Sequence, residues 1–197
     1  MKKLISFLSL AFFVAFASNV SAQDKWIIDA SHSTIGFSVT HLMISEATGK
    51  FTKFEGSLTG KKEDFSDATV ELTIDAASVN TEDPKRDGHL KGADFFDVEK
   101  FPKITFKSKE MKLVSGKNYK LTGDLTMHGV TKTVTLDVEF KGSVKNPWGM
   151  MVAAFKLTGK INRQEFGVKW SKALDNGGTV VGDEVIISGT IELTKKA

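Results

Sequence analysis

The stretch RDGHLKGADFF, residues 86–96, holds the residue types that most readily do chemistry. It combines an arginine, two aspartates, a histidine and a lysine with a pair of phenylalanines. An arginine and a histidine so close together could bind an anionic group or transfer a proton. The same charges could also fasten one element to another, so their role depends on the elements that position them.

The other residues that could form a reactive or metal-binding site follow no recognisable motif. The histidines are His32, His41, His89 and His128, and none has the helical i, i+4 spacing or the carboxylate partner of a zinc site. The sequence has no cysteine, no nucleophile elbow, no phosphate-binding loop and no dinucleotide-binding glycine pattern. We therefore expect no metal site and no enzymatic activity.

Alternation of apolar and polar residues predicts that most of the chain forms antiparallel strands with one wet face. The runs lie at 33–40, 48–60, 70–75, 103–114, 118–127, 133–140, 150–161 and 184–194. The dipeptide His128-Gly129 predicts a tight hairpin between two of them. Even strand spacing without long helices predicts a mainly β fold, an eight-stranded antiparallel barrel.

A short helical insertion at about 83–101 is expected to interrupt the strands and to carry the charged stretch. Asp83 suits a helix N-cap, Pro84 suits the first helical position and Gly92 suits the C-terminal stop. A second short turn is expected over 94–101. The charged residues are thus predicted to lie on a helix and its exit.

Spacing along this helix predicts which side chains share a face. Arg86, His89 and Leu90 are related by i, i+3 and i+4, so if Leu90 faces the barrel, Arg86 and His89 face it too. Asp87 and Lys91 predict a solvated ion pair on another face. Arg86 could anchor the helix on a carboxylate or on backbone carbonyls, or it could contact a ligand head group, and we favour the anchoring role.

Four predicted strands have a glycine between two inward-facing apolar residues, at Gly56, Gly123, Gly159 and Gly189. Because strand side chains alternate, each glycine lies on the same face as those apolar neighbours. The glycines either allow the coiling that a small barrel needs, or leave interior volume for an apolar ligand such as a lipid. The pattern supports both interpretations equally.

The first 22 residues have the pattern of a secretory signal peptide, with Lys2 and Lys3 before an apolar run at 4–17 and small residues up to Ala22. The run is shorter than the ~20 residues that span a bilayer, so we expect cleavage after Ala22 and no integral membrane anchor. The remaining residues, 23–197, suit a single domain with a substantial core. An exported chain without cysteine suggests the bacterial periplasm.

The charges argue against a nucleic-acid partner. The formal net charge is only +3, and basic and acidic residues are interspersed along the chain. Nothing resembles the basic stripe that neutralises a phosphate backbone.

Several blocks of the sequence resemble the YceI-like family. The most specific are RDGHLKGADFF at 86–96 and GDLTMHGVT at 123–131, and others lie at 26–42, 49–58 and 161–168. The resemblance implies a lipocalin-like barrel, exported to the periplasm, that holds amphiphiles with long apolar tails, polyisoprenoids and isoprenoid quinones foremost. The lipocalin Gly-x-Trp signature is absent, so the likeness to lipocalins is one of architecture.

The family has no catalytic motif to transfer, so the resemblance implies a binding site made of inward-facing apolar residues. The expected ligand-binding residues are Phe37, Val39, Phe51, Phe54, Leu72, Ile74, Phe95, Phe96, Phe106, Leu125, Met127, Leu136, Phe155, Leu157, Phe166 and Ile187. His41, Arg86 and His89 are expected to contact a head group or to anchor the helix.

The leading hypothesis is a periplasmic protein that sequesters or transports such an amphiphile, with no cofactor apart from the bound lipid or quinone. The second is an enzyme that acts on a small amphiphile at the barrel mouth, through Arg86, His89 or His41. The third is a ligand-free structural or stress-response protein whose barrel is solid. A homodimer is compatible with the sequence.

Overall fold

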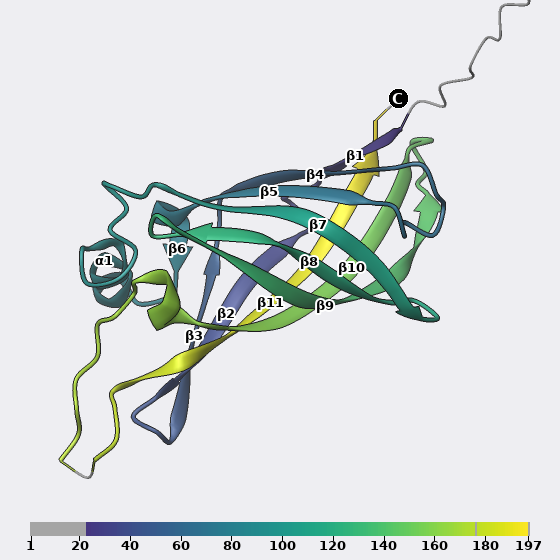
Figure 1. The fold of residues 1–197 in the computed structure, drawn as a ribbon. Helices are drawn as coiled ribbons and strands as arrows, with labels where there is room; N and C mark the ends of the chain where they lie inside the picture. The colour runs from purple at the N-terminus through teal and green to yellow at the C-terminus, as the bar shows by residue number, and fades with distance from the viewer. Residues whose placement is uncertain (1–22, 176, 197) are drawn as a thin grey trace, which may run out of the picture.

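The structure is a computed structural model that describes residues 23–175 and 177–196 (Figure 1). The expected signal peptide and its cleavage after Ala22 lie outside the described residues. The strands are β1 (Asp24–Ile28), β2 (Thr34–His41), β3 (Ser45–Phe51), β4 (Phe54–Gly60), β5 (Thr69–Asp75), β6 (Val79–Asn80), β7 (Lys103–Ser115), β8 (Asn118–Met127), β9 (Val130–Lys145), β10 (Met151–Asn162) and β11 (Val181–Lys195). The helices are the 3₁₀ turns η1 (Ala76–Ser78) and η2 (Arg163–Phe166) and the α-helix α1 (Pro84–Lys91).

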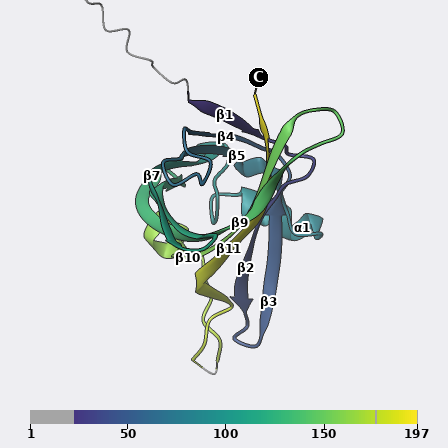
Figure 2. The same ribbon diagram turned by 90° about the vertical axis from the view of Figure 1, so that its right-hand side faces the viewer.

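The sheet closes into a barrel because the last strand pairs along both of its edges. β11 pairs with β10 along one edge, and along the other with β2 through 181–190 and with β1 through 193–195. β1 and β2 are thus two halves of one barrel strand, and β3 with β4 and β5 with β6 are broken in the same way. The closed barrel therefore has eight antiparallel strands, which confirms the predicted fold class, and Figure 2 shows the strands curling into a ring.

The broken strands explain where the strand prediction fails. β1 is missed because Trp26, Ile27 and Ile28 form a short continuous apolar run rather than an alternation. The predicted run at 48–60 covers the end of β3 and all of β4, which are separated by Thr52 and Lys53. The alternation changes phase at this break, because Phe51 lines the cavity at an odd position and Leu58 at an even one. The predicted run overlooked that change and joined the two strands.

The hairpin between β8 and β9 has the predicted two-residue loop. Met127 pairs with Val130, and the residues between them, His128 and Gly129, have φ angles of 51° and 74°. Two consecutive left-handed residues form the type I′ turn whose twist matches that of the flanking strands.

Helix α1 begins and ends where the sequence predicts. The Asp83 carboxylate accepts hydrogen bonds from the backbone N–H groups of Lys85 at 2.9 Å and Arg86 at 3.2 Å. Pro84 is the first helical residue, and Gly92 follows the last. The helix and the turns after it lie across one end of the barrel (Figure 1), so the predicted helical insertion is confirmed.

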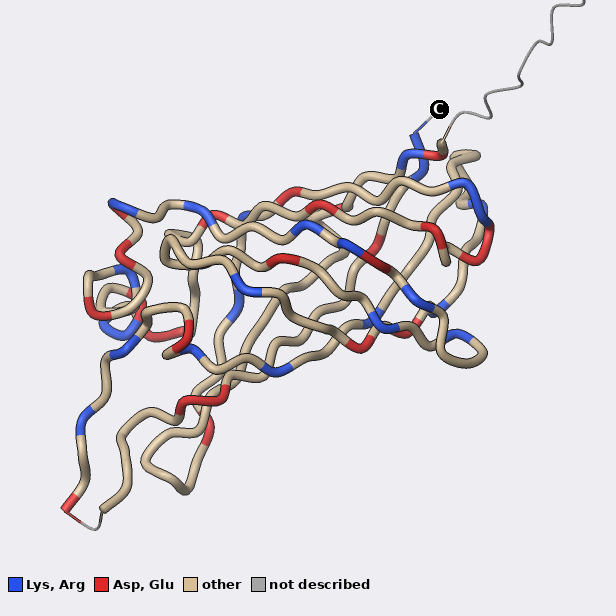
Figure 3. Tube along the Cα trace, viewed as in Figure 1, with Lys and Arg blue, Asp and Glu red and all other residues tan. Residues whose placement is uncertain are grey.

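Two surface properties bear on partners. Figure 3 shows basic and acidic residues interspersed over the described trace, without a stripe of one sign. Among the described residues, no helix has the length and hydropathy needed to cross a bilayer.

Candidate ligand-binding cavity

The barrel contains a cavity of about 210 Å³ with an almost entirely apolar lining. The lining extends from Leu90 and Phe96, in the helical insertion, to Val138 and Leu193 on the strands. Among the described lining residues, only Ser57 and Arg163 have polar side chains. Such a cavity suits an apolar tail better than a sugar or nucleotide, and it does not fit the solid barrel of the third hypothesis.

The structure places fourteen of the sixteen residues predicted to bind ligand in the cavity wall. They are Phe37, Val39, Phe51, Leu72, Ile74, Phe95, Phe96, Phe106, Leu125, Met127, Leu136, Phe155, Leu157 and Ile187. The other two, Phe54 and Phe166, are not lining residues. Phe54 begins β4 directly after the strand break and is half-buried, whereas Phe166 lies in η2 and is 2% exposed within the core. Contact of the fourteen with a ligand stays a prediction.

Further lining residues were missed although strand alternation reveals them. Leu58, Leu121, Ile161 and Ile191 each lie two residues from one of the inward-facing glycines, and all four line the cavity. Met111 is a different case, because a register shift in β7 precedes it and breaks the alternation there.

The four inward-facing glycines form recesses in the wall that neighbouring side chains fill. A Cβ added at Gly123 would lie 2.5 Å from Cζ of Phe106, so the ring lies directly over this glycine. The other pairs are Gly56 with Ile28, Gly159 with Leu136 and Gly189 with Leu157. One interpretation expected the glycines to leave empty space at their own positions, and they do not, because neighbouring side chains lie over them. They let large lining side chains lie close to the wall, which leaves room along the barrel axis.

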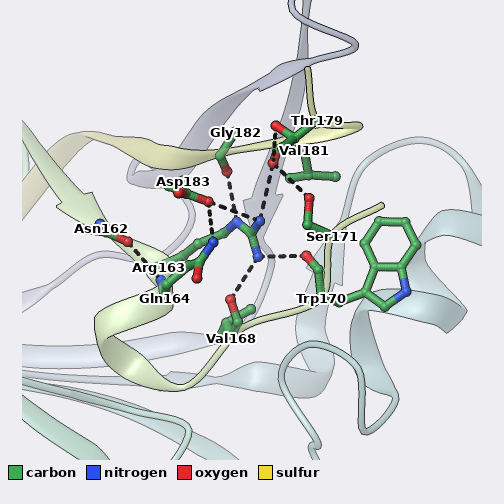
Figure 4. A network of polar contacts seen from close by, with 10 residues as sticks. All are labelled: Asn162, Arg163, Gln164, Val168, Trp170, Ser171, Thr179, Val181, Gly182 and Asp183. Atoms are coloured by element: carbon green, nitrogen blue, oxygen red, sulfur yellow. Dashed lines mark hydrogen bonds and ion pairs between the residues drawn. The ribbon is translucent and has the colours of Figure 1, made fainter. Parts of the chain in front are cut away.

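Arg163 is the charged residue of the lining, and the sequence prediction missed it. It is 4% exposed and lies two residues after Ile161, on the same inward face, so strand alternation could have found it. Its partners are the carbonyl oxygens of Gly182, Val168, Trp170 and Val181 at 2.8, 2.7, 2.8 and 3.2 Å, and Oδ1 of Asp183 at 3.5 Å (Figure 4). Burial lowers the pKa of Arg163, yet the guanidinium keeps its charge because its ordinary pKa lies far above neutrality.

These contacts engage the guanidinium and join two segments of the chain. All three nitrogens of Arg163 donate to backbone carbonyls, so a ligand head group would have to displace an existing bond. The contacts tie the segment 168–170 to the start of β11. Nε2 of Gln164 donates to Asp183 at the same junction (Figure 4). Arg163 is therefore a clamp at the cavity wall.

One end of the barrel, here named the Phe65 end, is closed by the loop 61–68 between β4 and β5. Phe65 is 4% exposed. Its ring centroid lies 5.2 Å from those of Phe140 and Phe155 and 5.5 Å from that of Trp26. This cluster of four rings fills the barrel at that end.

Hydrogen bonds hold the loop at the Phe65 end in place. The Asp67 carboxylate accepts from the backbone N–H groups of Lys61 at 2.9 Å and Lys62 at 3.1 Å, and the Lys61 bond lowers the pKa of Asp67. The Tyr119 hydroxyl donates to the carbonyl of Asp64, and burial raises the pKa of Tyr119.

The other end, here named the helix end, is covered by α1, the turns after it and the segment 168–170. No residue of α1 is buried, but half-buried Leu90 reaches the cavity. The ring centroids of Phe95 and Trp170 are 5.3 Å apart, and that of His89 lies 5.0 and 5.1 Å from them. Side-chain contacts between two separate segments therefore cover this end.

The predicted head-group residues, His41, Arg86 and His89, are not among the lining residues. Arg86 is exposed and donates from Nε and Nη2 to Oγ1 and O of Thr81, both at 2.8 Å, which is the contact expected of a helix anchor. His41 ends β2. The expectation that Arg86 and His89 share the inward direction of Leu90 is wrong, because Arg86 turns back to the segment before the helix.

Asp87 does not form the predicted surface pair with Lys91. Its carboxylate accepts from the backbone N–H and the hydroxyl of Thr81 at 2.8 and 2.7 Å, and the hydroxyl contact lowers the pKa of Asp87. Nε2 of His89 lies 3.0 Å from Oδ2 of Asp94 instead of facing the cavity. The charged side chains of residues 86–94 thus attach the helix to Thr81 and to the turn that follows it.

The structure brings His32 close to two carboxylates, which the sequence spacing does not reveal. Nδ1 of His32 lies 3.0 Å from Oδ2 of Asp29 and 3.9 Å from Oε1 of Glu192, and the three could together offer ligands to a metal ion. The Ser31 hydroxyl and His32 lower the pKa of Asp29 to about 2, and Asp29 raises the pKa of His32. The cluster lies outside the cavity lining and fastens the break between β1 and β2 to β11, so we assign it a structural role.

Sequence comparison gives a match over most of the chain. A family model described as a YceI-like domain matches residues 26–193. The UPF0312 protein SAB2563 of Staphylococcus aureus (strain bovine RF122 / ET3-1) is 39% identical over 171 residues, which cover 86% of this chain and 97% of that protein. The matches confirm the resemblance that the sequence motifs indicate.

Several solved structures have a similar fold. BcnA of Burkholderia cenocepacia has a TM-score of 0.73 and 25% identity, over 84% of this chain and 98% of BcnA. A polyisoprenoid binding domain from Saccharophagus degradans, implicated in plant cell wall breakdown, has a TM-score of 0.61 and 16% identity, over 87% and 98% of the two chains. At that identity the likeness shows the fold alone.

Proposed function

Because this chain belongs to the YceI-like family, we propose that it binds a long-chain amphiphile, a polyisoprenoid or an isoprenoid quinone, with the apolar tail in the barrel cavity. The observation that carries the proposal is the lining, which is apolar apart from Ser57 and the already bonded Arg163. A protein of the same fold is described as a polyisoprenoid binding domain, and the resemblance to the YceI-like family implies this ligand class.

Burial of the tail is sufficient to drive binding. Each methylene removed from water contributes ~0.8 kcal/mol, so about three or four isoprene units could offset an association cost of ~4–15 kcal/mol. Arg163 has no need to bind the head group, because its donors already meet backbone carbonyls. We therefore expect discrimination by chain length and girth more than by head group.

Binding suits the site better than catalysis. An enzyme acting through Arg86, His89 or His41 would need those side chains to face the cavity, and none of them is a lining residue. The lining residues also include no nucleophile paired with a base. In the proposed function, the protein sequesters or transports its ligand unchanged and needs no cofactor.

The proposed location is the periplasm, after cleavage behind Ala22. The basic, apolar and small residues at the start of the chain support export. The homodimer that the sequence allows stays a prediction.

Native mass spectrometry tests the proposal directly. Protein purified without detergent should carry a co-purifying lipid, and delipidated protein should take up a polyprenyl lipid or a quinone. Leu157→Trp enlarges a lining side chain and should reduce uptake at least about tenfold, whereas Val144→Trp, on the exposed part of β9, should not. A protein that stays lipid-free and refuses both probes would contradict the proposal.

A further inference from the structure

The loop between β2 and β3 presents three consecutive bulky apolar side chains to solvent. Leu42, Met43 and Ile44 are 39%, 58% and 88% exposed. We name these three residues the apolar tip. The backbone N–H of Leu42 donates to the carbonyl of Val180 at 2.9 Å, so the tip lies beside the connection that leads into β11. Figures 1 and 2 show both segments projecting together beyond the barrel.

The backbone of the apolar tip is unfavourable for the residues that occupy it. Leu42 and Met43 have φ angles of 51° and 66°, in the left-handed region that glycine and asparagine adopt far more readily. Two such residues cost free energy that a tip selected only for folding would avoid. The strained conformation points to a function that needs these exposed side chains.

The apolar tip continues the wall of the cavity. Val39 and Val181 both line the cavity, and Val181 pairs with His41, the residue directly before the tip. Val39 is three residues from Leu42. The tip therefore lies next to the part of the cavity near the helix end, away from the ring cluster at the Phe65 end.

We propose that the apolar tip inserts into a lipid bilayer and holds the helix end of the cavity against the membrane, where the ligand enters or leaves. This inference rests on the proposed function, because a ligand with a long apolar tail is stored in bilayers rather than free in water.

A bilayer fits the apolar tip better than a protein partner does. Three side chains offer at most a few hundred Å², well below the ~1,000 Å² of a stable protein interface, whereas insertion needs only a small apolar wedge. Exposed charges of both signs lie on the segments next to the tip, Glu46 on β3 and Lys172 on the strand connection whose carbonyl accepts from the Val180 backbone N–H. The apolar contact therefore drives insertion, and added salt should change it little.

Flotation with vesicles of phosphatidylethanolamine and phosphatidylglycerol tests the inference. The triple variant Leu42→Asn, Met43→Gly, Ile44→Ser places residues suited to positive φ at the first two positions, so it should fold at least as stably as the original chain. We expect vesicle affinity to fall at least about tenfold and lipid uptake from vesicles to slow, while uptake from detergent micelles stays unchanged.

Trp148→Ser is the matched control, because Trp148 is 80% exposed on the turn between β9 and β10, away from the tip. It should leave vesicle binding unchanged. Vesicle binding that survives the triple variant, or that is lost in Trp148→Ser alone, would overturn the inference. So would a dimer that the triple variant splits without any vesicle binding, because the tip would then contact a second copy. If the original chain takes up lipid from micelles but does not bind vesicles, membrane insertion of the apolar tip is refuted and the proposed function is not. If it takes up lipid from neither source, the proposed function is refuted.

Discussion

The Phe65 end and the helix end of the barrel are closed by different means. At the Phe65 end, the buried ring of Phe65 packs against three rings on the strands. The loop that carries Phe65 is held by hydrogen bonds of Asp67 and Tyr119. At the helix end, a helix without a buried residue lies across the barrel. The half-buried ring of Trp170 and the buried ring of Phe95 join it to the segment that Arg163 holds. Buried packing resists opening more than exposed contacts do. We therefore expect the Phe65 end to serve stability and the proposed ligand to pass through the helix end.

The largest expected effect is at the Phe65 end. Phe65→Ala should lower the free energy of unfolding by ~3–5 kcal/mol, because it leaves a void inside a ring cluster. Phe96→Ala, a half-buried ring at the helix end, should cost less than half as much. Urea unfolding of both variants checks the difference. An equal or greater loss of stability for Phe96→Ala would show that the Phe65 end does not contribute more to stability than the helix end.

Removing the clamp should give the next largest effect. Arg163→Met leaves several buried carbonyls without a donor and should cost ~2–4 kcal/mol. It should also speed ligand release, since the segment 168–170 loses its hold on β11. Stopped-flow transfer of a fluorescent polyprenyl lipid measures that rate. Lys160→Met, which removes an exposed ion pair between β10 and Glu184 of β11, should leave both quantities nearly unchanged.

A smaller effect is expected from the helix cap. Asp83→Ala should cost ~0.5–2 kcal/mol through the loss of the N-cap and should speed ligand exchange. Asp64 makes a similar contact at the Phe65 end, where its carboxylate accepts from the Ser66 backbone N–H at 3.0 Å. Asp64→Ala should leave ligand exchange unaltered in the same transfer assay. If both variants speed exchange equally, ligand passage is not confined to the helix end.

The smallest expected effect is a rise in the rate of ligand exchange at acidic pH. The Thr81 hydroxyl holds the pKa of Asp87 below its ordinary value of 3.8. A lowered carboxyl pKa stabilises the folded state above the ordinary value, and this contribution is lost as the pH falls through the lowered one. Ligand exchange should therefore quicken below about pH 4, and Asp87→Asn should flatten that rise. An unchanged pH profile in Asp87→Asn would show that ionisation of Asp87 does not control ligand exchange at the helix end.

The closed barrel and most of its lining could be predicted because both follow from alternation along single strands. Twelve of the fourteen predicted lining residues lie on strands, and the other two, Phe95 and Phe96, lie in the turns after α1. The Phe65 end could not be predicted, since Phe65 lies in a loop without periodicity and enters the barrel through a left-handed backbone, at φ 57°. The direction of Arg86 also escaped prediction. Helical spacing shows which residues share a side of a helix, but not that a long side chain turns back to Thr81.

The pairing of the last strand with the first has a consequence for the order of folding. β11 closes the barrel by joining β1, so the contact with the longest sequence separation is also the one that seals the wall. Contacts between distant residues form slowly, because a long loop must be ordered first. A growing chain that has not yet released residues 181–195 is an open sheet with two unpaired edges, β10 and the strand made of β1 and β2. The barrel that would hold the proposed ligand is therefore closed only after residues 181–195 have joined it.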